Sequence, residues 1–192
     1  MKIPSVSTVF FAFVICLTLT SMSSAQANES EAWEALREGR AVLMLRHALA
    51  PGTGDPGKFD VDDCSTQRNL NETGREQARA WKPFLAEQGI EEARVFSSQW
   101  CRCLDTAKEM DMGPVEEMVS LNSFFDNRGD GQMQTRQTIA IVNELESGPP
   151  VVLVSHQVNV TALTDVYPSS NEGLVIALPL SENPTVLAKV SP

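Results

Sequence analysis

The chain has 192 residues, of which 42% are hydrophobic and 21% are charged. This is enough for one ordinary globular domain, too short for two large ones, and unlike a disordered or fibrous protein. Lys and Arg total 15 against 25 Asp and Glu, so the formal charge is -10. That charge opposes general attraction to nucleic acid or to an anionic membrane surface. We expect no nucleic-acid partner, and any anionic substrate needs a local group of arginines.

The first 27 residues have the pattern of a secretory signal peptide. Lys2 precedes an apolar run over residues 9–19, and the small-residue stretch ends in Ala25-Gln26-Ala27, an A-x-A cleavage site. The run is shorter than the roughly 20 residues of a spanning helix. We therefore predict that residues 1–27 are removed and that residues 28–192 form a periplasmic or secreted domain without a membrane span.

The rest of the chain alternates short apolar runs with longer amphipathic ones, which is typical of a mostly parallel sheet covered by helices. In chain order we expect a helix over residues 31–38, a strand over 41–46, a helix over 73–88, a strand over 94–97, a helix over 100–110, a strand over 115–121, a helix over 132–147, a strand over 151–155, a helix over 158–164, and strands over 174–178 and 185–190. The predicted fold is one three-layer α/β domain.

Residues 48–71 stand apart because they are rich in Gly, Pro, Asp, Ser and Asn and show no period. A loop of about 20 residues is unusual in a compact domain, and the usual reasons are function or disorder. The glycines in PGTGDPG lack the G-K-[ST] of a phosphate-binding P-loop, so they indicate turns. Because this loop directly follows the first strand, we expect it to border a functional site.

Three cysteines lie beyond the predicted leader: Cys64, Cys101 and Cys103. In an oxidising compartment an odd number indicates one disulfide and one thiol. We expect Cys64 to pair with either Cys101 or Cys103; the alternatives are three buried thiols, or metal or redox chemistry. Zinc prefers four ligands, commonly from C-x2-C pairs, so a lone C-x-C pair predicts no metal site.

The chain contains two histidines, and each directly follows an apolar strand: AVLMLR precedes His47 and PPVVLVS precedes His156. In open α/β sheets, ligands bind beyond the carboxyl ends of the strands. Arg46 adjoins the first histidine, and Arg102 lies at the start of the helix that follows the second strand. A guanidinium matches two phosphate oxygens, and a helix amino terminus adds backbone donors. We predict an anion pocket formed by these four residues.

Four segments in this order are similar to motifs of the histidine phosphatase superfamily, the phosphoglycerate-mutase-like proteins. They are Leu45-Arg46-His47, residues 70–78 (LNETGREQA), residues 97–107 (SSQWCRCLDTA) and residues 152–156 (VLVSH). The resemblance implies a phosphoglycerate-mutase-like fold and a nucleophilic His47 that forms a phosphohistidine. It further implies that Arg46, Arg102 and a cationic His156 hold the phosphoryl oxygens, with no cofactor or metal.

The sequence departs from the family pattern at the proton donor for the leaving group. His156 is followed by Gln157, not by Gly or by the Asp that some acid phosphatases of the superfamily use. Mutase-type members use a Glu after the third strand, and residues 120–131 hold no clear match. Asp126 and Asp130 are the nearest candidates, and we take Asp126 as the candidate acid.

The resulting prediction is an exported phosphatase for phosphate monoesters, with Arg68 of the long loop as a further substrate contact. Export favours a small sugar phosphate or an envelope phosphate as substrate, by analogy alone. One alternative is a pseudo-phosphatase that binds phosphate but turns over slowly or not at all. Another is a thiol-redox protein that uses Cys101 and Cys103.

Overall fold

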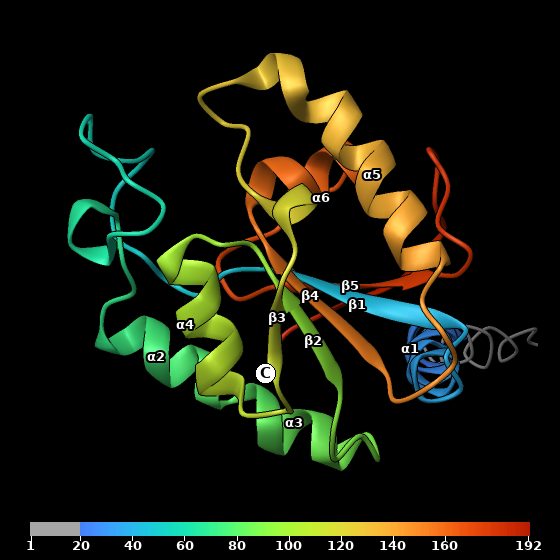
Figure 1. Cartoon of the computed structure of the whole chain (residues 1–192). Helices are drawn as coiled ribbons and strands as arrows, with labels where there is room; N and C mark the ends of the chain where they lie inside the picture. The colour runs from blue at the N-terminus through green and yellow to red at the C-terminus, as the bar shows by residue number, and fades with distance from the viewer. Residues whose placement is uncertain (1–19) are drawn as a thin grey trace, which may run out of the picture.

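The centre of the molecule is a six-stranded sheet, seen in a computed structural model that describes residues 20–192 (Figure 1). The strands are β1 (Ala41–Arg46), β2 (Arg94–Ser97), β3 (Val115–Glu117), β4 (Val151–Ser155), β5 (Gly173–Ala177) and β6 (Val186–Val190). Their order is β3-β2-β4-β1-β5-β6. The first four in that order run parallel, whereas β5 is antiparallel to both of its neighbours. The predicted mostly parallel α/β sheet is confirmed.

Helices cover both faces of this sheet (Figure 1). They are α1 (Thr20–Arg37), α2 (Glu72–Arg79), α3 (Trp81–Glu87), α4 (Cys101–Met110), α5 (Gly131–Asn143) and α6 (Gln157–Thr164), with short 3-10 turns η1 (Cys64–Thr66), η2 (Val119–Leu121) and η3 (Arg128–Asp130). The core on one face takes side chains from α1, α3 and α4, and the core on the other takes them from α5 and α6. The domain therefore has three layers.

The side chains of β1 alternate between these two cores. Leu43 and Leu45 pack in the core that contains Trp81, whereas Val42 and Met44 pack in the other. All four strand residues are essentially inaccessible to solvent. Burying each such side chain contributes about 1.5–3 kcal/mol. Burial on both faces explains why the strand is an unbroken apolar run.

The helix expected over residues 73–88 is two helices, so that prediction was wrong. In one continuous helix the ring of Pro83 would clash with the carbonyl of Arg79, and Pro83 has no N–H to donate. The chain instead ends α2 at Arg79 and starts α3 at Trp81, which places Pro83 in the first turn of α3. The first-turn N–H groups have no partner within a helix, so proline is tolerated there.

The strand expected over residues 115–121 is also shorter than predicted. β3 lies at the edge of the sheet and pairs only with β2, in a register that ends at Ser97 opposite Glu117. Beyond Glu117 the chain has no strand partner and turns into η2. Leu121, the last residue of η2, is buried. The apolar pattern had indicated burial correctly but not the conformation.

Residues 1–19 of the predicted signal peptide lie outside the described residues, and residues 20–27 belong to α1. The predicted helix over residues 31–38 therefore starts earlier than expected. Within the described part of the chain, no helix combines the length and the apolar character needed to cross a membrane.

Candidate active site

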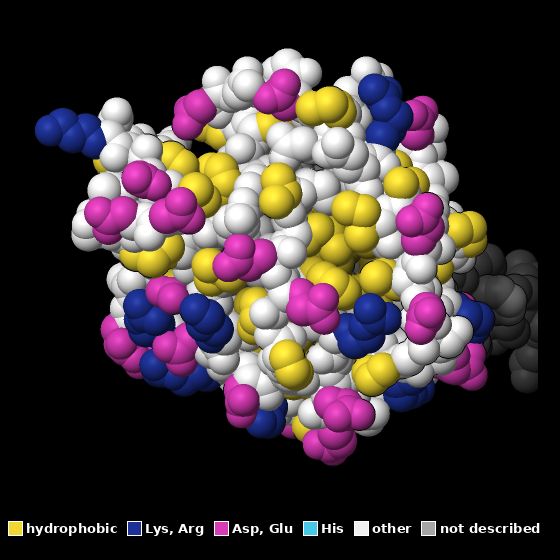
Figure 2. All heavy atoms as spheres, viewed as in Figure 1, with side chains coloured by type: hydrophobic (Ala, Val, Ile, Leu, Met, Phe, Trp, Pro, Cys, Tyr) yellow, Lys and Arg dark blue, Asp and Glu magenta, His cyan; other side chains and the backbone are white. Residues whose placement is uncertain are grey.

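The pairing of β1 with β4 brings the two histidines together. Arg46 lies opposite Ser155 in this parallel pair, and the His47 amide donates to the Ser155 carbonyl at 2.9 Å. The rings of His47 and His156 lie 5.5 Å apart, centroid to centroid. Both side chains are buried, and no histidine is visible on the face shown in Figure 2. The sheet therefore places both rings at one point beyond its carboxyl edge.

A cavity of about 150 Å³ opens at this point. The residues predicted to form the site and found in its lining are Arg46, His47, Arg68, Arg102 and His156. Three arginines around so small a cavity favour an anion over a cation. Among the described residues, no group of three or more His, Cys, Asp and Glu side chains is arranged to hold a metal ion.

The tautomer of His47 is set by the backbone. Its Nδ1 lies 2.7 Å from the carbonyl oxygen of Ala48, which can only accept, so Nδ1 carries the proton and Nε2 does not. Burial, followed by the charge of Arg102, lowers the pKa of His47 to about 3. The imidazole is therefore neutral near pH 7, with an unprotonated Nε2 available as a nucleophile.

Two of the family-like motifs hold the backbone that orients His47. Thr106 accepts the Ala48 amide at 3.0 Å, and the Gln77 side chain accepts the Leu49 amide at 3.0 Å. Gly74 packs directly against this segment: a Cβ atom on it would lie 2.2 Å from the Leu49 carbonyl oxygen. These motif residues thus act by positioning the chain after β1.

His156 is held by hydrogen bonds at both ring nitrogens. Arg102 Nη2 donates to Nδ1 at 3.3 Å, so Nε2 carries the proton and donates to the Ser98 hydroxyl at 2.9 Å. Ser98 in turn donates to the Asn122 side chain at 3.2 Å. Burial is the main cause of a pKa well below the ordinary value, and the charges of Arg102 and His47 act in the same direction. These causes favour a neutral His156, whereas the charge of a bound phosphoryl group would act in the opposite direction and favour the expected cation.

Arg46 and Arg68 border the cavity with only part of their donors in use. Arg46 Nη1 donates to the Pro168 carbonyl at 3.2 Å, and its buried Nε has no partner among the described residues. Arg68 donates through Nε to the Gly54 carbonyl at 2.8 Å and through Nη1 to the Ala50 carbonyl. Burial and the charge of Arg102 lower the pKa of both groups. Arg68 therefore braces the long loop as well as lining the cavity.

Arg102 is engaged by an acidic residue that the sequence analysis did not identify. Asp55, from the long loop, accepts from Arg102 Nη1 at 2.5 Å and from Nη2 at 3.1 Å. The indole N–H of Trp100 also donates to Asp55, at 3.0 Å. The side chains of this ion pair are only 3% and 8% exposed, so it is largely removed from solvent. The sequence held one signal for Asp55: it is an acidic residue between Gly54 and Gly57, in the loop that follows His47.

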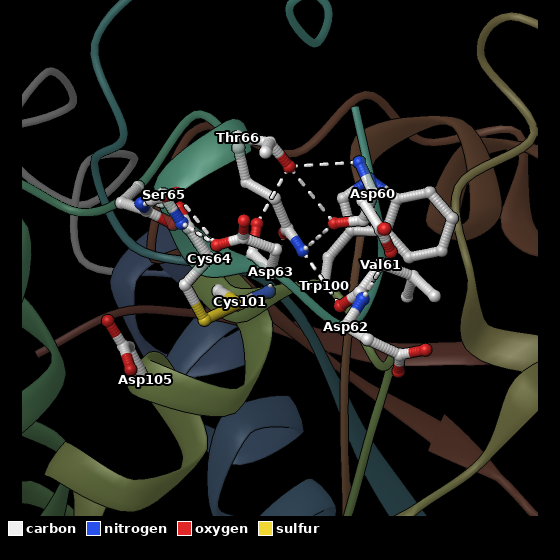
Figure 3. Close-up of a disulfide and its surroundings, with 12 residues drawn as sticks. Asp60, Val61, Asp62, Asp63, Cys64, Ser65, Thr66, Trp100, Cys101 and Asp105 are labelled. Carbon is white, nitrogen blue, oxygen red and sulfur yellow. Dashed lines mark hydrogen bonds between the residues drawn. A yellow bond between two sulfur atoms is a disulfide. The ribbon is translucent and has the colours of Figure 1, made fainter. Parts of the chain in front are cut away.

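A disulfide fixes this loop to the start of α4, next to Arg102 (Figure 3). Cys64 pairs with Cys101, and the Gln67 side chain accepts the Cys101 amide at 2.9 Å. The same Gln67 donates to two carbonyls earlier in the loop, those of Asp60 and Val61. The predicted disulfide is confirmed, with Cys101 as the partner.

Cys103 remains a buried thiol, and burial raises its pKa to about 12. It cannot form a redox pair with Cys101, which is already bonded to Cys64. A thiol of this pKa is also a poor nucleophile. The interpretation of Cys101 and Cys103 as a redox or metal-binding pair was wrong.

Asp126, the candidate acid from sequence, is not brought to the cavity. Its neighbours Ser123 and Phe125 line the cavity, but Asp126 itself is exposed and outside the lining. Asn122 anchors the start of this segment by accepting the Gln99 amide at 2.9 Å. The only carboxyl group in the lining, among the described residues, is that of Asp55.

Comparisons with known proteins agree with this fold. The family model of the histidine phosphatase superfamily (branch 1) matches residues 42–140. The structure of the protein histidine phosphatase SixA complexed with tungstate is 22% identical, with a TM-score of 0.57 over 79% of this chain and 97% of that chain. Among curated proteins, none matches the chain.

Two further solved structures share the fold at low identity. Mycobacterial glucosyl-3-phosphoglycerate phosphatase with VO3 is 17% identical, with a TM-score of 0.53 over 77% of this chain and 96% of that chain. Phosphoserine phosphatase from Entamoeba histolytica with 3-phosphoglyceric acid is 12% identical, with a TM-score of 0.53 over 79% and 97%. The family match spans half of the chain and includes His47 and Arg102, so this chain belongs to the histidine phosphatase superfamily.

Proposed function

We propose that this protein is an exported phosphatase that hydrolyses phosphate monoesters through a phosphohistidine on His47. One observation carries the proposal: a buried, neutral His47, with its proton fixed on Nδ1, lines an arginine-rich cavity. A neutral imidazole nitrogen is the form that can attack phosphorus. Arg46 and Arg102 each have a buried Nε without a partner among the described residues, so neither guanidinium has all its donors in use.

In the proposed reaction, Nε2 of His47 attacks phosphorus while the bond to the leaving oxygen breaks. Arg46, Arg102 and His156 hold the equatorial oxygens and offset the charge that develops there, which supplies most of the catalysis of phosphoryl transfer. Water then attacks the phosphohistidine and releases phosphate. The reaction uses only side chains of the protein, so we expect it to proceed without a metal or cofactor.

Export is supported by the leader pattern of residues 1–27 and by the Cys64–Cys101 disulfide, since disulfides persist in oxidising compartments. We place the protein in the periplasm or outside the cell. The substrate class that fits is a small phosphorylated compound, such as a sugar phosphate or an envelope phosphate. The small cavity admits a phosphoryl group and leaves the rest of the substrate at its mouth.

One observation favours a second candidate, a phosphate-binding protein with little turnover. The acid expected at Asp126 lies outside the cavity, so a poor leaving group lacks that proton source. The two candidates share the anion site and differ in whether His47 becomes phosphorylated.

The test is release of p-nitrophenol from p-nitrophenyl phosphate, with EDTA present, by the chain that starts at residue 28. We expect turnover that persists in EDTA and falls by at least about 1000-fold in His47→Ala, because the nucleophile is removed. Equal turnover in the two proteins would contradict a role for His47. Tight vanadate binding without turnover in the wild type would favour the phosphate-binding candidate.

A further inference from the structure

The proposed phosphatase needs a proton for its leaving group, and the cavity lining offers one carboxyl group among the described residues. We propose that Asp55 is this proton donor and that the substrate prepares it for the task by taking its place on Arg102. The inference rests on the proposed function, because it concerns the same cavity and the same reaction.

Asp55 occupies the donors that a phosphoryl group needs. Its two oxygens accept from the two Nη atoms of Arg102, at 2.5 and 3.1 Å. This planar fork is the geometry with which a guanidinium binds two phosphate oxygens. Arg102 is 3% exposed, so it has little room to bind both anions side by side. A phosphoryl group can use the fork only after the carboxylate has left it.

Leaving the fork changes the proton affinity of Asp55. Burial is the largest single influence and acts to raise the pKa of Asp55, but the hydrogen bond and charge of Arg102, the Trp100 indole and the charge of Arg68 together lower it. Once phosphate takes Arg102, Asp55 loses its strongest cationic partner and faces a dianion instead. Burial and a neighbouring negative charge both favour the protonated carboxyl. Binding of the substrate therefore converts a carboxylate into an acid at the edge of the cavity.

The loop is built to allow a short movement of this kind. Gly52 and Gly54 lie just before Asp55 in the chain and have positive φ values of 100° and 67°, a region that glycine enters without strain. Farther along, the Cys64–Cys101 disulfide holds the loop to α4. The indole N–H of Trp100 donates to Asp55 independently of Arg102 and can retain the carboxyl at the cavity. The acid is thus free to turn but not to leave the site.

The proton balances over the two half-reactions. As the bond from His47 Nε2 to phosphorus forms and the ester oxygen–phosphorus bond breaks, the leaving oxygen takes the proton of Asp55. In the second half, the Asp55 carboxylate accepts a proton from the water that attacks phosphorus, while the nitrogen–phosphorus bond breaks. The sum is an ester and water converted to an alcohol and phosphate, with His47 and Asp55 restored.

The test compares two leaving groups in Asp55→Asn. p-Nitrophenolate leaves with little need for a proton, whereas the alkoxide of glycerol 2-phosphate needs one. We expect kcat/KM for glycerol 2-phosphate to fall about 100- to 10,000-fold, and kcat/KM for p-nitrophenyl phosphate to fall less than about tenfold. Asp62→Asn, an exposed site on the same loop, is the matched control and should behave as wild type for both substrates.

A binding measurement separates this role from a structural one. Because asparagine carries no charge and competes poorly for Arg102, Asp55→Asn should bind vanadate more tightly than wild type, by several-fold or more. Such a gain cannot come from misfolding. Equal losses on both substrates, weaker vanadate binding, or the leaving-group effect in Asp126→Asn instead would each overturn the proposal. If the wild type hydrolyses neither substrate, the proposed phosphatase activity itself is contradicted. That outcome is distinct from the results above, which contradict only the role of Asp55 as proton donor.

Discussion

Two regions of different construction meet at the cavity. The histidines follow β1 and β4, in the middle of a sheet that is buried on both faces. Asp55 and Arg68 come from the long loop, which is held by the Cys64–Cys101 disulfide and by side-chain hydrogen bonds. The sheet can hold a nucleophile in one orientation, whereas the loop can exchange one ligand for another. In the proposed mechanism, the covalent step therefore takes place on the rigid sheet, and the proton comes from the loop, which can change partners.

Removing the disulfide should affect the loop and spare the sheet. In a chain-entropy estimate, a disulfide between residues separated by 37 positions contributes about 4 kcal/mol. We expect Cys64→Ser with Cys101→Ser to lower the free energy of unfolding by about that amount and to weaken vanadate binding. The checks are urea unfolding and vanadate inhibition of the double variant, compared with the wild type under the same conditions. Unchanged vanadate binding would show that the loop does not need this anchor.

Gly74→Ala should instead disturb the rigid region. The new Cβ would lie 2.2 Å from the Leu49 carbonyl oxygen, so the backbone that orients His47 must shift. Such overpacking costs about 1–3 kcal/mol, and kcat should fall with it because the nucleophile moves. Gly57→Ala is the matched control, since nothing lies within 4 Å of its added Cβ. Wild-type turnover in a folded Gly74→Ala variant would contradict this role for the motif.

Acid should weaken the sheet region through its histidines. The pKa of His47 is lowered from 6.5 to about 3, mainly by burial. Between these values the unfolded chain binds a proton that folded His47 does not, so stability falls as the pH falls. Below about pH 6, His47 alone should contribute a loss of about 1.4 kcal/mol per pH unit, and His156 acts in the same direction.

Urea unfolding at about pH 6 and about pH 5 measures this slope. The amide of His47→Asn does not titrate. This variant should therefore lose the part of the slope that His47 contributes, about 1.4 kcal/mol per pH unit. An unchanged slope in that variant would mean that His47 keeps an ordinary pKa in the folded protein.

The sequence predicted the rigid region far better than the loop. Each histidine follows a short apolar run, and such runs specify a strand locally, so the chain positions of His47 and His156 could be predicted before the structure was known. Which strands are adjacent could not, because two strands and four α-helices lie between β1 and β4 in the chain. That both histidines follow strands predicted a shared pocket at the carboxyl edge of a sheet, and the family resemblance supported this prediction.

The proton donor was predicted at the wrong place, Asp126, for a related reason. Asp126 was chosen by its position after the third strand, but the path of that segment depends on contacts such as the Asn122 side chain with Gln99. Asp55 lies in a loop without periodicity, and its approach to Arg102 depends on long-range pairing. The choice between Cys101 and Cys103 had the same difficulty: residues two apart on a helix face different ways, and local sequence does not say which faces the loop.

The central claim is that His47 carries the phosphoryl group during turnover. The most direct measurement is mass spectrometry of the enzyme mixed with substrate and quenched in alkaline denaturant, because phosphohistidine is labile in acid. We expect one added phosphoryl group on His47, and none in His47→Asn. Turnover by the wild type without this species, or a phosphoryl group on another residue, would contradict the account.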